Sequence, residues 1–206
     1  MTNAVPGRVH AGASRPVLAD RIRSRGLATD AALVAGGALF TAAMAQVEVP
    51  MWPVPITGQT LAVVLVGATL GARRGAISML LYMVAGLAGA PFFADMTGGL
   101  HALAVPSFGY VIGFVPSAAA IGWLARRNWD RRFVRGVIAF TLASAIPFVT
   151  GLPYLAVVLG QLGAPHDLAT VFRLGLAPFV VGGIAKAVIA AGVLPLAWRA
   201  IGRRSH

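Results

Sequence analysis

The stretch "VPITGQTLAVVLVGATLGARRGAISMLLYMVAGLAGAPFF", Val54 to Phe93, contains two apolar runs separated by a pair of arginines. The runs cover residues 58–72 and 75–93, and Arg73 and Arg74 lie between them. A helix that crosses a membrane needs about 20 apolar residues, with a range of about 17–25. The stretch therefore predicts two spanning helices joined by a short basic turn. The first run is short, so we expect that helix to be tilted or shielded by its neighbours.

The same pattern extends along most of the 206 residues. Hydrophobic residues make up 58% of the chain and charged residues only 11%, against about 25% charged residues in soluble domains. The composition predicts an all-α membrane protein with six transmembrane helices in one domain over residues 29–198. The four further helices are expected at 29–48, 106–125, 134–160 and 174–198. Pro147, Gly151 and Pro153 predict a kink or a break in the fifth helix.

The arginines predict the orientation of the chain in the membrane. Residues 1–28 form a basic extension and residues 199–206 a basic tail, and further arginines lie between the second and third helices and between the fourth and fifth. If both termini are cytoplasmic, fifteen of the sixteen arginines face the cytoplasm and only Arg173 faces outward. The net charge of +11 therefore reflects membrane topology rather than binding to nucleic acid. We expect a multi-pass protein of the bacterial cytoplasmic (inner) membrane.

A second interpretation treats residues 1–45 as a cleaved signal peptide ending near the small residues "AMAQ". The basic segment is long for a signal peptide, and cleavage would leave five helices. We therefore favour an uncleaved first helix.

The acidic residues and histidines argue against an enzyme. No two of the six acids fall within one helical turn, and the four histidines are scattered. Paired carboxylates or metal ligands are what intramembrane hydrolysis or phosphoryl transfer would need. The sequence thus predicts no catalytic residue, no metal and no cofactor.

Lys186 is the only lysine of the chain, and it lies inside the last apolar run. A lysine near the middle of a membrane costs about 2.5–3.5 kcal/mol on insertion scales, so it needs a partner or a water-filled cavity. No acid lies beside it in the sequence. A bound anion such as a substrate carboxylate is one partner, and helix-end carbonyl groups are the alternative.

Two segments between the helices carry polar groups that suit a small-molecule pocket. The first contains Gln59 and Thr60, and the second contains Asp95, Thr97 and His101 among glycines and aromatics. An ordinary aromatic belt at the membrane interface is the alternative for either segment alone.

The first helix presents small residues on one face, since alanines recur at steps of four and three. Such a face lets two helices approach closely in lipid. It is either an internal packing face or a docking surface for a second membrane protein. The residues are Ala31, Ala35, Ala38, Ala42 and Ala45.

The opening stretch resembles the BioY family, the biotin-binding S components of energy-coupling factor (ECF) vitamin transporters. The family pattern reads P-h-P-[IV]-T-x-Q-T, then G-x-x-x-G, then Y-x-x-x-G-x-x-G-x-P-x-F. The matching residues are Pro53, Pro55, Ile56, Thr57, Gln59, Thr60, Gly71, Gly75, Tyr82, Gly86, Gly89, Pro91 and Phe93. A weaker match continues through Pro106, Gly109, Tyr110, Gly113 and Phe114, and the resemblance covers about residues 30–198.

The resemblance implies roles for individual residues. In the family's last helix, which reads P-F-h-x-G-D-h-x-K, the lysine resembles a ligand for the biotin carboxylate and corresponds to Lys186. The family aspartate, which contacts the ureido end, is replaced by Gly183. Either Asp95 or other polar groups substitute for it, or the ligand differs from biotin, or the affinity is lower. Tyr82, Phe93 and Tyr110 are candidates to pack on the bicyclic ring, and Gln59 is a candidate to hydrogen-bond it.

The resemblance also implies an S-component-like bundle with six helices and both termini inside. The chain has no Walker motif, so the energy for transport would come from partners. Those partners would be an ATPase pair and a transmembrane coupling protein, docked on the alanine face (Ala31, Ala35, Ala38 and Ala42). We expect high-affinity capture and uptake of biotin. The alternatives are an S component for another carboxylated vitamin and a non-transporting membrane scaffold subunit.

Overall fold

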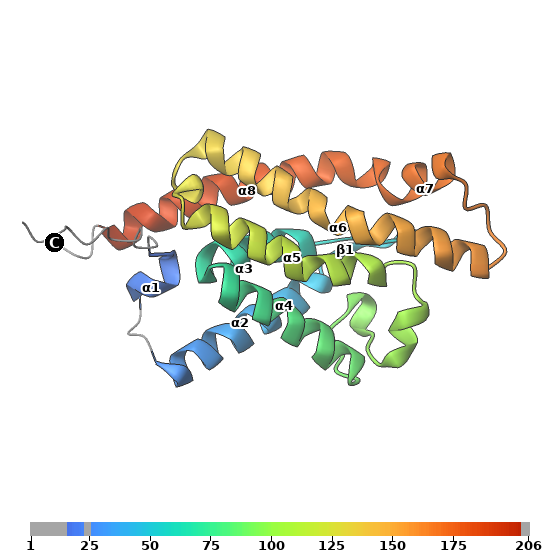
Figure 1. The fold of residues 1–206 in the computed structure, drawn as a ribbon, viewed down its shortest axis with the longest axis horizontal. Helices are drawn as coiled ribbons and strands as arrows, with labels where there is room; N and C mark the ends of the chain where they lie inside the picture. Colours follow the sequence, from blue (N-terminus) through green and yellow to red (C-terminus); the bar gives the residue numbers. More distant parts are fainter. Residues whose placement is uncertain (1–15, 23–25, 203–206) are drawn as a thin grey trace, which may run out of the picture.

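The fold is a bundle of helices, seen in a computed structural model that describes residues 16–22 and 26–202 (Figure 1). Parts of the predicted basic extension and tail, residues 1–15, 23–25 and 203–206, lie outside the described residues. The helices are α1 (Leu18–Ile22), α2 (Leu27–Ala45), α3 (Gln59–Leu70), α4 (Ala72–Leu87), α5 (Phe108–Ala125), α6 (Phe133–Gln161), α7 (Leu168–Gly175) and α8 (Ala177–Gly202).

Short elements connect the helices where the sequence is rich in proline and glycine. Strand β1 (Glu48–Val49) pairs antiparallel with β2 (Ile56–Thr57), and the two join α2 to α3. Three single-turn helices follow later in the chain: η1 (Ala94–Met96), η2 (Leu100–Ala104) and η3 (Trp129–Arg131).

Four helical stretches within the described part of the chain are long and apolar enough to cross a membrane. They are Leu27–Ala45, Phe108–Ala125, Phe133–Gln161 and Leu168–Ile201. The predicted runs at 58–72 and 75–93 are helices too, but α3 has 12 residues and α4 has 16. The chain is therefore a multi-pass, mostly helical membrane protein in which α3 and α4 are the shorter elements.

The turn between α3 and α4 is tighter than the sequence predicts. Arg73 and Arg74 do not form it, because both lie in the first turn of α4. Gly71 alone separates the two helices, at φ +85°, a backbone conformation that favours glycine. Arg74 is thereby placed to form ion pairs with Asp20 at 2.8 Å and with Asp30 at 2.7 Å.

Helix α6 runs unbroken through Pro147 and Pro153, so of the predicted kink or break the structure contradicts only the break. A proline inside a helix removes the N–H that would bond to the carbonyl four residues earlier. For Pro147 that carbonyl belongs to Ala143, and the Ser117 hydroxyl of α5 donates to it at 2.7 Å. A neighbouring helix thus supplies the missing donor, as membrane proteins commonly do.

The alanine face of α2 is partly an internal face. Ala38 and Ala42 are buried, with exposed fractions of 1% and 8%, and they pack in the core with residues of α3 and α4. Their burial favours the interpretation as an internal packing face for these two residues. The helices come this close because Gly37 lies between them: a Cβ there would stand 2.7 Å from the Ser78 hydroxyl. Ala31 remains exposed and Ala35 half-buried.

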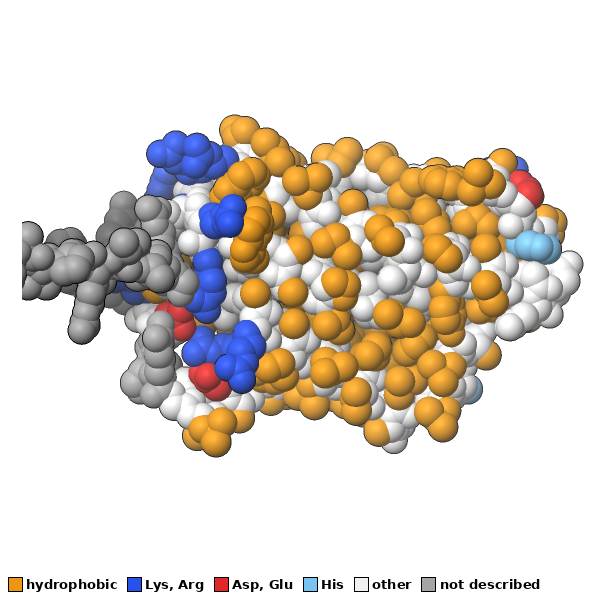
Figure 2. Space-filling view, in the orientation of Figure 1, with side chains coloured by type: hydrophobic (Ala, Val, Ile, Leu, Met, Phe, Trp, Pro, Cys, Tyr) orange, Lys and Arg blue, Asp and Glu red, His pale blue; other side chains and the backbone are white. Residues whose placement is uncertain are grey.

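The described start of the chain packs on the same end of the bundle as the end of α8 (Figure 1). Val17 is fully buried, α1 contacts α3 and α8, and the Arg131 guanidinium donates to the Pro16 carbonyl at 3.2 Å. Arginine side chains gather at this end, while an apolar surface covers the middle of the molecule (Figure 2).

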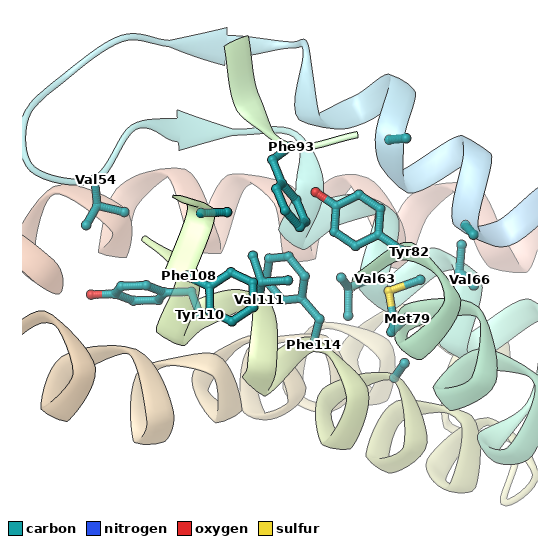
Figure 3. Close-up of a cluster of buried hydrophobic side chains, with 14 of the residues drawn as sticks. Val54, Val63, Val66, Met79, Tyr82, Phe93, Phe108, Tyr110, Val111 and Phe114 are labelled. Carbon is teal, nitrogen blue, oxygen red and sulfur yellow. The ribbon is translucent and has the colours of Figure 1, made fainter. Parts of the chain in front are cut away.

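Two groups of buried side chains form the core. One is rich in alanine and lies between α3, α5, α6 and α8, together with Val17. The other, shown in Figure 3, is aromatic and includes Tyr82, Phe93, Phe108 and Tyr110. The aromatic group borders the cavity described next.

Candidate binding cavity

A cavity of about 370 Å³ lies inside the bundle. Its wall comes from the β1–β2 connection, the start of α3, the segment around η1 and η2, and helices α5, α6 and α8. Elements far apart in the sequence therefore share one site. Its apolar wall with a few convergent polar groups is typical of small-molecule sites.

Lys186 is the cation of this cavity. It is the tenth of the 26 residues of α8, half-buried, and its ammonium donates to the Thr57 carbonyl at 2.5 Å and to the Thr60 hydroxyl at 3.0 Å. Thr57 ends β2 and Thr60 lies in the first turn of α3, so one backbone carbonyl and one hydroxyl accept from the ammonium. An ammonium carries three N–H donors. Two are used in these bonds, which leaves one for a ligand.

Gln59 lies beside these groups and is held by two hydroxyls. The Thr57 hydroxyl donates to the Gln59 Oε1 at 2.7 Å, and the Gln59 Nε2 donates to the Tyr82 hydroxyl at 2.5 Å. A side-chain amide has two acceptor sites on oxygen and two N–H donors. One of each therefore remains on Gln59, which lines the cavity.

Five of the seven predicted ligand contacts line the cavity. They are Gln59, Phe93, Asp95, Tyr110 and Lys186. Asp95 is exposed, at φ +55° within η1, whereas Phe93 and Tyr110 are buried. The Tyr110 hydroxyl donates to the Gly175 carbonyl at 2.8 Å, which ties α5 to the end of α7.

Tyr82 does not reach the cavity wall. It is fully buried behind Phe93, at 5.6 Å between ring centroids and nearly perpendicular to it (Figure 3). Tyr82 contacts Phe93 and Gln59, which do line the cavity, and its packing on the ligand stays a prediction.

Gly183 is also absent from the cavity wall, yet its neighbours on the same helix face belong to it. Phe179 and Lys186, four residues before and three residues after Gly183, both line the cavity. A Cβ added at Gly183 would have no atom within 4 Å. The helix therefore offers open space at the position where the family pattern has an aspartate.

Other wall residues were missed at the sequence level. Thr57 matches the motif but was not among the predicted ligand contacts, and its contact with Lys186 is made by a backbone carbonyl that no residue type reveals. Thr60 was expected among the polar groups of the pocket, and it lines the cavity. Phe179 could have been found, because it lies seven residues before Lys186 and thus on the same helix face. Phe108, Phe148 and Glu48 come from other elements and have no such signal.

The cavity can hold a small molecule with an apolar body and an anionic group, because aromatic rings and one ammonium share its wall. These features define a multi-pass helical membrane protein with an internal cavity suited to a small molecule. The sequence profile of the BioY family matches residues 14–203, and the chain belongs to that family.

Individual relatives agree with this assignment. The "Biotin transporter BioY" of Rhizobium etli is 36% identical over 146 residues, which cover 68% of this chain and 75% of the relative. The "Putative biotin transporter BioYB" of Bacillus subtilis is 33% identical over 172 residues, or 83% of this chain and 84% of the relative. The fold resembles the crystal structure of the S-component for biotin from an ECF-type ABC transporter, with a TM-score of 0.68 at 22% identity. That match covers 85% of this chain and 95% of the other.

Proposed function

We propose that this protein captures biotin and takes it up across the membrane as the substrate-binding (S) component of an ECF transporter. The proposal rests on one observation above all: a BioY-family chain places its only lysine on the wall of an apolar cavity. The relatives named above are called transporters, and the protein acts in transport rather than as an enzyme.

Lys186 binds the carboxylate of the ligand through its third N–H. The ammonium is already positioned by Thr57 and Thr60, so little side-chain entropy is lost when the ligand arrives. Gln59 offers one donor and one acceptor to the polar end of the ligand, and Phe93 and Tyr110 pack on its rings. Asp95 is a further polar group on the cavity wall for the ligand, whereas the place of the family aspartate at Gly183 is open.

The proposed topology has six membrane-spanning helices, α2, α3, α4, α5, α6 and α8, with both termini in the cytoplasm. Domain limits at residues 29–198 follow from it. Its support is the charge distribution, because exposed arginines gather at the end where α1 and the end of α8 lie (Figure 2). Cytoplasmic loops carry such an excess in membrane proteins. The membrane is the bacterial inner membrane.

The partners are an ATPase pair and a transmembrane coupling protein, which supply the energy for transport. Ala31 and Ala35, the more accessible part of the alanine face, remain the proposed contact with the coupling protein.

A second candidate is uptake of another carboxylated vitamin. Gly183 favours it, because the family aspartate that resembles a ureido ligand is missing and no described side chain fills the space at that position. Lys186 would keep its role in this case, while the polar end of the ligand would differ.

Uptake of labelled biotin by cells that lack their own uptake and synthesis tests the proposal. We expect accumulation in cells that express the chain together with the coupling protein and the ATPase pair, and no accumulation with Lys186→Met. Equal accumulation in cells without the chain, or none in cells with all three partners, would overturn the proposal.

A further inference from the structure

Tyr82 lies outside the cavity and yet takes part in its hydrogen bonding. The side chain is fully buried on α4, and its hydroxyl accepts the Gln59 amide N–H. Gln59 is itself 8% exposed and lines the cavity. A buried polar group is seldom left without a partner. The tyrosine hydroxyl provides an acceptor for the Gln59 amide, which a phenylalanine at this position could not do.

The contacts continue from Gln59 to the cation. The Thr57 hydroxyl donates to the other end of the same amide, and the Thr57 carbonyl accepts from Lys186. Tyr82 on α4, Gln59 on α3, Thr57 on β2 and Lys186 on α8 thus form one connected series of hydrogen bonds. Such a series fixes the orientation of its inner members more firmly than isolated bonds would.

Packing holds the tyrosine ring independently of its hydroxyl. The ring stacks on Phe92 at 6.3 Å and meets Phe93 edge-on at 5.6 Å between centroids. Removal of the hydroxyl alone therefore keeps these contacts and frees only the amide. The ring and the hydroxyl have separable tasks.

We propose that Tyr82 is a positioning residue that sets the selectivity of the cavity by clamping the Gln59 amide between its own hydroxyl and that of Thr57. The clamp leaves one N–H and one lone pair of the amide for the ligand in a fixed plane. It selects ligands whose polar end presents an acceptor and a donor side by side. The inference rests on the proposed function, because biotin is the probe.

Calorimetric titration of biotin into purified variants tests the clamp. We expect Tyr82→Phe to weaken binding by about threefold to tenfold, the range of one hydrogen bond. Thr57→Val should weaken it similarly, whereas Thr57→Ser keeps the hydroxyl and should stay within about twofold of the wild type. Tyr154→Phe is the matched control, because the Tyr154 hydroxyl donates to the Leu103 carbonyl and the side chain does not line the cavity.

The double variant Tyr82→Phe/Thr57→Val separates positioning from a general structural role. Both single changes act on one amide, so the combined loss should be smaller than the product of the two single losses. If the two losses of affinity multiply in the double variant, or if Tyr82→Phe binds biotin within twofold of the wild type, the inference is overturned. The proposed function would then still stand. A wild type without any affinity for biotin would overturn the proposed function, and the inference with it.

Discussion

The Lys186 ammonium on α8 donates to the Thr57 carbonyl, 2.5 Å away at the entrance to α3. This bond joins two segments 129 residues apart in the sequence and places the only lysine of the chain on the cavity wall. The contact also explains how a cation is tolerated inside an apolar helix. Protein oxygens satisfy two of its N–H groups, and the cavity receives the third.

Gly183→Asp should bind biotin more tightly than the wild type. The added side chain enters open space, on the helix face that Phe179 and Lys186 present to the cavity. Gly192→Asp is the matched control, because a Cβ at Gly192 also meets nothing within 4 Å, and Gly192 lies six residues beyond Lys186, the last residue of α8 on the cavity wall. Calorimetric titration measures both. Weaker binding by Gly183→Asp would mean that another group already occupies the place.

Asp20→Asn should lower the melting temperature of the detergent-solubilised protein more than Asp30→Asn does. Both carboxylates pair with Arg74, but the Asp20 side chain is 4% exposed and the Asp30 side chain 43%. Hydrogen bonds to buried charged groups contribute about 1.5–3 kcal/mol, and exposed ion pairs about 0–1 kcal/mol. Equal effects of the two substitutions would contradict the idea that Asp20 fastens residues 16–22 to the bundle.

Ala38→Leu should destabilise the protein by about 1–3 kcal/mol, the usual cost of an overfilled core. Ala38 is 1% exposed inside the bundle, whereas Ala31 on the same helix is exposed, so Ala31→Leu should leave the melting temperature nearly unchanged. If Ala31→Leu instead disrupts assembly with the coupling protein, the proposed contact is supported. A stable Ala38→Leu variant would contradict the internal packing of this face.

The wild type should lose stability as the pH rises, and Asp130→Asn should remove this loss. Burial raises the pKa of the Asp130 carboxyl, which accepts a hydrogen bond from the Trp198 indole at 2.6 Å. The folded protein therefore holds this proton at pH values where the unfolded chain, with a pKa of about 3.9, has released it. Stability then falls as the pH rises from the unfolded pKa toward the folded one. Thermal melts of both proteins across this range measure the difference.

Asp167→Asn is the control of opposite sign. The Asp167 carboxylate accepts from the Thr170 backbone N–H at the start of α7, and the Thr170 side chain together with this N–H lowers the pKa of Asp167. Its contribution to stability is present above the unfolded pKa and is lost as the pH falls through the folded pKa. If the melting temperature of Asp130→Asn depends on pH as that of the wild type does, this would contradict the claim that burial raises the pKa of Asp130.

The sequence predicted site residues best where a side chain carries a high energetic cost in its surroundings. Lys186 stands out because a charge in an apolar helix needs a partner, and the structure places it on the cavity wall. Gln59, Phe93 and Tyr110 followed from the family motif. Tyr82 belongs to the same motif, yet a motif does not tell whether a side chain meets the ligand or the residue that meets it.

Long-range packing decided what the sequence left open. The regular spacing of the alanines is the same for an internal face and a docking face, and only the position of α4 buries Ala38. Pro147 predicts a break until Ser117 of α5 is known to satisfy the Ala143 carbonyl. The Thr57 carbonyl lies in the site in a strand, β2, that pairs with β1. No side chain in the sequence predicts this pairing.

The most direct test of the account is calorimetric titration of biotin into the purified wild type and into Lys186→Ala, with Thr60→Val as the control that removes one hydrogen bond but keeps the cation. We expect nanomolar-to-micromolar binding by the wild type, a modest loss for Thr60→Val and no measurable binding by Lys186→Ala. Unchanged affinity in Lys186→Ala, or a wild type that does not bind biotin, would contradict it.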